Sequence, residues 1–241
     1  MSNRVRKERE RAEREELILA HARRILLRDG YQSLNLDELA KAIDYSKGVI
    51  YLHFETKEDL ALAVATRTCR ERVAFSERGA KFQGSTRERI RAIGVACWQF
   101  AIEHPDYFQV ELMLKSASFW EKASSKRQQE HSMECGRCFR PVLGIVEEAV
   151  KCGDLPEGLR PEHMTFGLIA VTIGSHIMLQ QMEMRLLADI QDPVRILRQN
   201  QDCMLDGLGW RPFMRDHDYH ATDRRIQQEL FPEATWLLDG H

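Results

Sequence analysis

The chain has 241 residues, of which 43% are hydrophobic and 30% are charged, a composition typical of a folded globular protein rather than a disordered or fibrous one. Its 35 Lys and Arg residues nearly balance its 37 Asp and Glu residues, for a formal net charge of -2, so any contact with nucleic acid must come from a local basic patch. The most apolar stretch, Phe166–Leu179, is shorter than the roughly 20 residues of a membrane-spanning helix. The arginine-rich N-terminus lacks an apolar signal segment, so we expect a cytoplasmic protein with no membrane partner.

Apolar residues recur every three or four positions along almost the whole chain, and alternating strand patterns are nearly absent. The sequence therefore predicts an all-α fold. A first helix carries the apolar stripe Ile18–Leu26 and ends at Gly30. The further helices are expected at residues 36–43, 47–53, 57–78, 87–103, 105–114, 120–152, 162–187 and 193–208, and a polar tail follows Gly209.

Residues that favour helix N-termini stand before three of the early helices. Asn35 precedes the second helix, with Glu38 placed to complete a capping box, Ser46 precedes the third, and Thr56 precedes the fourth. Short helices joined by a tight turn at Asp44 are typical of a helix-turn-helix, in which the later helix enters the major groove of DNA.

The side chains of this segment make that interpretation specific. Between Asn35 and Leu60 the chain reads NLDELAKAIDYSKGVIYLHFETKEDL, which closely resembles the DNA-binding signature of the TetR family of bacterial transcriptional regulators. The resemblance covers Leu17 to about Leu62. It implies an N-terminal helix-turn-helix domain at residues 1–56, a helical effector-binding and dimerisation domain at 57–208, and a C-terminal tail at 209–241.

The helix over residues 47–53 contains the expected DNA contacts. Ile50 and Phe54 should face the core. Ser46 offers a hydroxyl and free N–H groups to a phosphate or base, and Gly48 allows close backbone approach. The family pattern implies phosphate contacts from Tyr51, His53 and Lys57 and base contacts from Lys47, Val49 and Leu52.

Two positions depart from the family pattern. Asp44 stands where glycine is usual in the turn, and Leu52 stands where an aromatic residue or histidine is commoner. Residues 1–57 contain 12 basic and 10 acidic side chains, a net of +2 that is modest for a DNA reader. An alternative function is therefore a helical dimer that binds a ligand or a protein and has lost DNA binding.

The N-terminal segment from Arg4 to Arg14 has two interpretations. It could be an arm that reaches the minor groove. The spacing of Arg6, Glu10 and Arg14 instead favours a solvated extension of the first helix, because residues four apart pair on a helix surface.

Two clusters could bind a metal. Cys135 and Cys138 have the spacing of a metal or redox pair near His131, although ordinary helical cysteines are the expected interpretation. The tail cluster is expected to be a solvated loop, and it comprises Asp216, His217, Asp218, His220 and Asp223. We expect all six cysteines to be thiols, because this chain has no disulfide framework. No nucleophile elbow, phosphate loop or HExxH motif occurs, so we expect no enzyme activity, metal or cofactor.

Bulky residues that follow the helix-turn-helix segment are candidates for an effector cavity, which the resemblance places among the middle helices. They are Trp98, Phe100, Tyr107, Phe108, Met113, Phe119, Trp120, Phe139, Phe166 and His176. The resemblance also implies a dimer through the last two long helices. Gly167, Ala170 and Gly174 would permit close approach of the helices there, and Met178 is a further candidate for the dimer interface.

Together these features predict a homodimeric, sequence-specific transcriptional regulator. The expected mechanism is repression, with release from a palindromic operator when a small, hydrophobic effector binds. The sequence does not separate a repressor from an activator, because that depends on where the operator lies.

Overall fold

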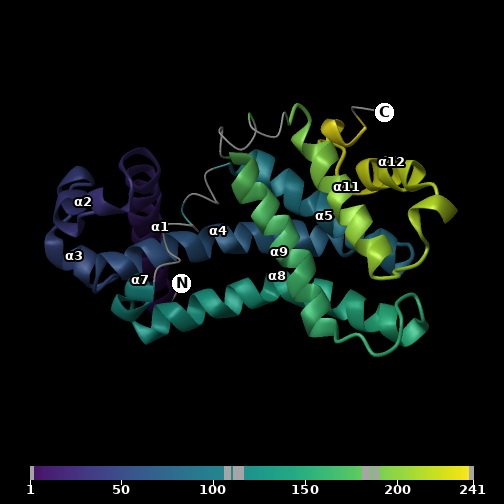
Figure 1. Cartoon of the computed structure of the whole chain (residues 1–241). Helices are drawn as coiled ribbons and strands as arrows, with labels where there is room; N and C mark the ends of the chain where they lie inside the picture. Colours follow the sequence, from purple (N-terminus) through teal and green to yellow (C-terminus); the bar gives the residue numbers. More distant parts are fainter. Residues whose placement is uncertain (1–2, 106–109, 111–116, 181–185, 187–189, 239–241) are drawn as a thin grey trace. The chain divides into compact units, whose positions relative to one another are not determined.

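The computed structural model describes residues 3–105, 110, 117–180, 186 and 190–238, and these form helices without any strand. The expected all-α fold, with a helix-turn-helix followed by a larger helical part, is confirmed. The α-helices of Figure 1 are α1 (Asn3–Asp29), α2 (Leu36–Ala42), α3 (Lys47–Tyr51), α4 (Lys57–Gly79), α5 (Thr86–Glu103), α7 (Ala117–Lys122), α8 (Ser125–Cys152), α9 (Pro161–Gln180), α11 (Pro193–Gly207) and α12 (Tyr219–Glu229). Short 3-10 turns lie at Tyr31–Ser33, Met214–Asp216 and Thr235–Leu237.

Two of the expected helices need comment. The single helix predicted over 120–152 is wrong: it is two helices, because the chain breaks between α7 and α8. There the backbone N–H of Ser124 donates to Asp59 Oδ1 at 2.7 Å, and Ala123 O accepts from Gln128 Nε2 at 2.9 Å. These groups are thus satisfied by side chains rather than by a continuous helical ladder. The helix expected at 105–114 lies largely outside the described residues, as does the predicted end of the 162–187 helix.

The contacts divide the chain into two compact units. Unit 1 comprises Met1–Glu71 and Pro105–Cys135, and unit 2 comprises Arg72–His104 and Gly136–His241. The long helices α4 and α8 contribute residues to both units. None of the described helices is both long and apolar enough to cross a membrane.

Unit 1 is built on an apolar core from α1 to α4. Ile18, Leu26 and Leu39 are almost fully buried in it, as the stripes of the sequence predict. In this unit α2 and α3 pack side by side (Figure 1). The core therefore fixes the orientation of the two helices of the helix-turn-helix.

Unit 2 has an apolar core around Trp210, which is fully buried, and a second cluster that includes the C-terminal residues. The segment after Gly209 is folded: α12 packs on α5, and Phe231 and Leu237 are fully buried. Arg87, also fully buried, donates to the backbone oxygens of Trp210 at 2.7 Å and Pro212 at 2.9 Å. The tail is thus an integral part of unit 2.

Candidate nucleic-acid interface and ligand cavity

The turn between α2 and α3 is formed by local hydrogen bonds. Asn35 Oδ1 accepts from the N–H groups of Asp37 at 2.9 Å and Glu38 at 3.4 Å, which caps α2 as the sequence predicts. Asp44 has φ 56°, a left-handed conformation that favours glycine and that Asp tolerates better than most residues. The next N–H, of Tyr45, returns to Ala40 O at 2.9 Å and closes the turn. The backbone therefore has the conformation that a glycine would adopt here.

Helix α3 presents one side to the core and the other to solvent. Ile50 is fully buried and Phe54 nearly so, as expected. On the opposite side Leu52 is 76% exposed and Tyr51 is 48% exposed. Tyr51 and Leu52 are therefore the side chains of this segment that face away from the core.

Ser46 begins α3, but its hydroxyl makes no capping hydrogen bond, which differs from the expected cap. Its carbonyl accepts from the Val49 N–H at 3.0 Å. Gly48 is exposed, and an added Cβ there would meet only Ser46 Oγ at 3.9 Å. The start of α3 is therefore sterically open.

The cations of this surface have acidic neighbours. Lys47 forms an exposed ion pair with Asp37 of α2, and the hydrogen bond with Asp37 raises the pKa of Lys47. Lys57 Nζ lies 4.5 Å from the ring centroid of Tyr31. The Tyr31 hydroxyl donates to Glu58 at 2.6 Å. Burial is the larger cause that raises the pKa of Tyr31, and this hydrogen bond is the second. Any new anionic partner of Lys47 would have to displace Asp37.

His53 has a different environment from the other expected contacts. Its side chain is only 4% exposed, and its Nδ1 lies 3.4 Å from Glu15 of α1. Arg127 of α8 donates to the same carboxylate at 3.2 Å and to His53 O at 3.3 Å, and its guanidinium lies 4.9 Å from the Phe54 ring centroid. His53 thus helps to hold the end of α3 against α1 and α8.

The N-terminal segment continues α1 as an exposed helix. Its charges pair along the helix, with Arg4 and Glu8 at 3.0 Å and Arg6 and Glu10 at 3.5 Å. Arg14 donates instead to the backbone oxygen of Glu10. Of the two interpretations, the structure has the helical extension.

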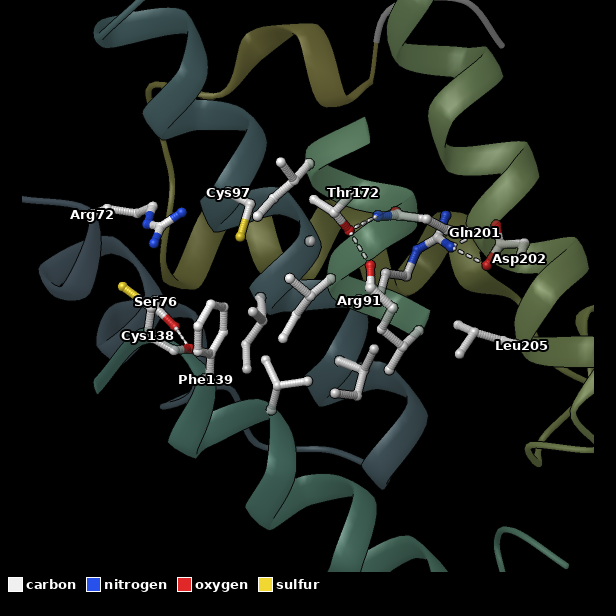
Figure 2. A pocket seen from close by; sticks show the side chains of 17 residues that line it. Arg72, Ser76, Arg91, Cys97, Cys138, Phe139, Thr172, Gln201, Asp202 and Leu205 are labelled. Carbon is white, nitrogen blue, oxygen red and sulfur yellow. Dashed lines mark hydrogen bonds and ion pairs between the residues drawn. The ribbon is translucent and has the colours of Figure 1, made fainter. Parts of the chain in front are cut away.

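Unit 2 contains a cavity of about 90 Å³, lined by residues of α4, α5, α8, α9 and α11 (Figure 2). Its walls are mainly aliphatic, with Ile93, Val142 and Leu168 among them. Arg72 lies at one end and Gln201 and Asp202 at the other. This combination of an apolar wall with a few polar groups is typical of small-molecule sites, although pockets for drug-sized ligands measure roughly 300–1,000 Å³.

The polar end of the cavity is held by a hydrogen-bond network. Gln201 Nε2 donates to Thr172 Oγ1 at 3.0 Å, and Arg91 donates to both carboxylate oxygens of Asp202 at 2.8 Å. Burial lowers the pKa of Arg91, but hydrogen bonds to Asp223 and Asp202 outweigh it and the net effect raises that pKa. Arg91 is therefore a permanent cation that belongs to this network.

The expected cavity residues are mostly elsewhere. Of the seven that the structure describes, only Phe139 lines the cavity. Phe119 and Trp120 belong to unit 1, Phe100 is fully buried against Phe75, and Phe166 is 74% exposed. Trp98 packs on His176 with ring centroids 4.7 Å apart and on Trp236 at 6.2 Å. Tyr107, Phe108 and Met113 lie outside the described residues.

Helix α9 carries an exposed apolar face. Phe166, Ala170, Gly174 and Met178 are spaced four apart, Phe166 and Met178 are 74% and 49% exposed, and Ala170 is exposed too. An added Cβ at Gly174 would meet nothing within 4 Å. Gly167 differs, because its added Cβ would lie 2.9 Å from Met204 Cε of α11. Gly167 therefore allows α9 and α11 to pack within one chain. Ala170, Gly174 and Met178 lie instead on the exposed apolar face of α9.

The helix-turn-helix segment is similar to that of known proteins. Residues 18–64 match the family model described as "Bacterial regulatory proteins, tetR family". The N-terminal helices of this chain therefore match the DNA-binding segment of that family. Its members regulate transcription by binding DNA and are not enzymes.

Individual relatives match over larger parts of the chain. The HTH-type transcriptional activator FasR of Mycolicibacterium smegmatis is 34% identical over 94 residues, which are 39% of this chain and 42% of FasR. The chain thus spans less than half the length of this relative. The fatty acid metabolism regulator protein of Bacillus subtilis is 23% identical over 68% of this chain and 84% of its own length.

Solved structures share the fold. The transcriptional regulator FadR from Bacillus subtilis in complex with stearoyl-CoA superposes with a TM-score of 0.62 at 16% identity, covering 80% of this chain and 98% of FadR. A protein from Rhodococcus sp. RHA1 has a TM-score of 0.65 at 22% identity, over 81% of this chain and 95% of that protein. The TetR-family fold therefore extends well beyond the matched head.

The two candidate metal clusters have other roles in the structure. No group of three or more potential ligands for a metal is found among the described residues. In the tail, Asp218 caps α12 by accepting from the N–H groups of His220 and Ala221, and Asp223 is fully buried with Arg91 at 2.6 Å. Cys135 and Cys138 belong to different units. Cys135 contacts the thiol of Cys69, which no local sequence spacing reveals.

Proposed function

We propose that the protein is a homodimeric, sequence-specific transcriptional regulator that leaves a palindromic operator when an apolar effector binds in unit 2. The observation that carries the proposal is the orientation of α3. Its buried side chains, Ile50 and Phe54, fix the helix, and its exposed ones, Tyr51 and Leu52, form a surface that the protein's own core does not use.

On this surface we assign base readout to Lys47, Val49 and Leu52, where the aliphatic side chains would contact thymine methyl groups. Tyr51 and Lys57 would position the phosphates. The buried ring of His53 supports a positioning role through Glu15 rather than a first contact with DNA. The head would correspond to residues 1–56, followed by the effector-binding and dimerisation domain at 57–208 and the tail at 209–241.

The exposed face of α9 supports the homodimer. Phe166, Ala170, Gly174 and Met178 form an apolar stripe longer than a lone solvent-facing helix requires. Two copies that pair through it would place two recognition helices on successive major-groove faces.

An acyl-CoA is the effector class to test first. Two relatives are named for fatty acid metabolism or bind stearoyl-CoA, and the cavity of unit 2 is lined mainly by aliphatic side chains. At about 90 Å³ the cavity is too small for a long acyl chain, so binding would have to separate the helices that line it. That requirement supplies a reason for the effector to favour a different conformation from the one that binds DNA.

The first experiment is selection of binding sites from random duplex DNA, followed by titration of the selected duplex and a scrambled one at two salt concentrations. We expect a palindrome with a preference of about a thousandfold. Lys47→Ala should weaken binding to the selected duplex and lower the salt dependence by about one counterion. Lys81→Ala is the matched control, because it removes an exposed lysine of unit 2 and should leave affinity unchanged.

Failure of the selection, with weak and equal binding to both duplexes, would favour a ligand- or protein-binding module that has lost DNA binding. The dimer is tested separately by sedimentation of Met178→Glu, which should dissociate, against Met133→Glu, a change at a methionine of unit 1 that is 65% exposed. Stearoyl-CoA should raise the melting temperature and release the selected duplex, whereas free CoA should do neither. Equal effects of the two compounds would contradict the acyl-binding role.

A further inference from the structure

Two helices of unit 1 bring four reactive or polar side chains together. Thr66 and Cys69 lie three residues apart on α4, and His131 and Cys135 lie four apart on α8, so each pair shares one face of its helix. The two sulfur atoms are 3.5 Å apart, and Cys135 Sγ is 3.3 Å from His131 Nε2. His131 Nδ1 is 3.1 Å from Thr66 Oγ1.

The hydrogen bonds determine where the protons lie. Thr66 donates its only hydroxyl proton to Leu62 O at 2.7 Å, so its oxygen accepts from His131 Nδ1. With the proton on Nδ1, neutral His131 has a lone pair on Nε2, which accepts from the Cys135 thiol. Cys69 in turn donates to Cys135 Sγ. Cys135 therefore has a base beside it and a donor that stabilises a thiolate.

The two thiols differ in access to solvent. Cys69 is fully buried, and Thr66 and His131 are 4% and 9% exposed. Cys135 is partly exposed. A small oxidant from solution can thus reach Cys135 and not Cys69. This asymmetry is what a reactive thiol and a resolving thiol require.

We propose that Cys135 and Cys69 are a peroxide-reactive thiol pair, with His131 as the base that activates Cys135. His131 Nε2 takes the Cys135 thiol proton, and the thiolate attacks one oxygen of hydrogen peroxide or an organic hydroperoxide. The O–O bond breaks, the leaving oxygen takes the proton back from His131, and Cys135 becomes a sulfenic acid while water or an alcohol leaves. The Cys69 thiol then attacks the Cys135 sulfur, the S–O bond breaks, and a second water leaves. The net reaction converts two thiols and one peroxide into a disulfide and two molecules of water, or one water and one alcohol.

The disulfide would join α4 to α8 inside unit 1. Its S–S bond of about 2.05 Å requires the sulfur atoms to approach by roughly 1.5 Å from their present contact, which rotation of the partly exposed Cys135 side chain can supply. Three of the other cysteines have different environments. Burial raises the pKa of Cys97 to about 11, and Cys152 and Cys203 are exposed.

The test is treatment of the reduced full-length protein with hydrogen peroxide, followed by alkylation and mass spectrometry of non-reduced peptides. We expect loss of two thiols and a cross-linked Cys69–Cys135 peptide. Cys69→Ser should stop the reaction at a sulfenic acid on Cys135, which dimedone traps. His131→Gln should slow the loss of Cys135 thiol at least about tenfold, since a general base contributes typically this much or more.

Cys203→Ser and Cys152→Ser are the matched controls, and both should form the disulfide at the unchanged rate. Circular dichroism shows whether Cys69→Ser and His131→Gln remain folded, and Cys69→Ala replaces the first if it does not. A disulfide that involves Cys138, or dimedone labelling of Cys135 no faster than of Cys152 in the Cys69→Ser variant, would overturn the proposal. This outcome is independent of whether the protein binds DNA.

Discussion

The two units use charge in opposite ways. In unit 1 the ion pair of Lys47 with Asp37 lies at the surface of the helix-turn-helix, where water and salt weaken it. In unit 2, Arg91 and Asp223 are buried, and Asp223 also pairs with Arg198. The surface charges of unit 1 can exchange partners at low cost, which suits a nucleic-acid contact, whereas the buried charges of unit 2 fix the tail to α5.

The largest expected effect comes from breaking the buried network. Asp223→Ala leaves Arg91 and Arg198 without a fully buried partner, and we expect the free energy of unfolding to fall by about 3–5 kcal/mol. Denaturant unfolding measures the loss, and hydrogen exchange locates it. Protection should fall in α5 and α12 and persist in α2 and α3.

Asp216→Ala is the control, because this aspartate lies in the same tail with its side chain 54% exposed. It should change the stability by less than about 0.5 kcal/mol. Equal loss of protection in the helix-turn-helix of Asp223→Ala would show that the two units unfold together, which would contradict the separation of their roles.

The buried network also explains which parts of the fold the sequence could predict. Asn35 and Asp192 cap helices with partners two or three residues away, so their helix starts can be predicted locally. Arg91 and Asp223 are 132 residues apart in the chain. No local pattern connects them, so the sequence predicts only a polar tail after Gly209 and not its fold.

The candidate sites also differ in whether local sequence patterns could predict them. The orientation of α3 follows from helical periodicity, and the prediction that Ile50 and Phe54 face inward is confirmed. The sequence predicts a cavity lined mainly by aromatic residues. Large rings such as Phe100 are instead packed into the core, and the cavity that remains is lined mainly by aliphatic residues. The spacing of Cys135 and Cys138 suggested a pair, whereas the thiol in contact with Cys135 comes from α4.

A second prediction concerns the pH dependence of unit 2. Burial lowers the pKa of His176, whose Nδ1 donates to Thr172 O at 2.7 Å. Because the folded-state pKa is below the unfolded value of about 6.5, the unfolded chain binds the proton first as the pH falls. The stability that neutral His176 contributes is complete above this value and is lost progressively below it.

Denaturant unfolding at about pH 7.5 and about pH 5.5 measures this loss. His176→Phe should show a smaller loss between the two pH values than the wild-type protein. His163→Phe, an exposed histidine of the same helix, should behave like the wild type. An unchanged pH dependence in His176→Phe would show that acid destabilisation of unit 2 arises elsewhere.

The smallest expected effect on stability comes from the turn between α2 and α3. Asp44 stands there in place of the glycine that is usual in the family. Asp44 adopts φ 56°, so Asp44→Gly relieves left-handed strain and at the same time adds freedom to the unfolded chain. The two effects nearly offset each other, and we expect a change in stability within about 0.5 kcal/mol. Removal of an exposed negative charge beside α3 should nevertheless tighten binding to all duplexes, and more so at low salt.

Asp44→Asn separates these contributions, because asparagine removes the charge and tolerates the left-handed conformation. If Asp44→Asn and Asp44→Gly tighten binding equally, the aspartate acts on DNA through its charge alone, and the turn is already shaped for the groove. If neither variant binds DNA better than the wild type, the charge at Asp44 does not reach the phosphates and the proposed orientation of α3 is wrong. Substitutions at Asp44 therefore test DNA binding by the head without disturbing its core, whereas Asp223→Ala tests the buried charge network of unit 2.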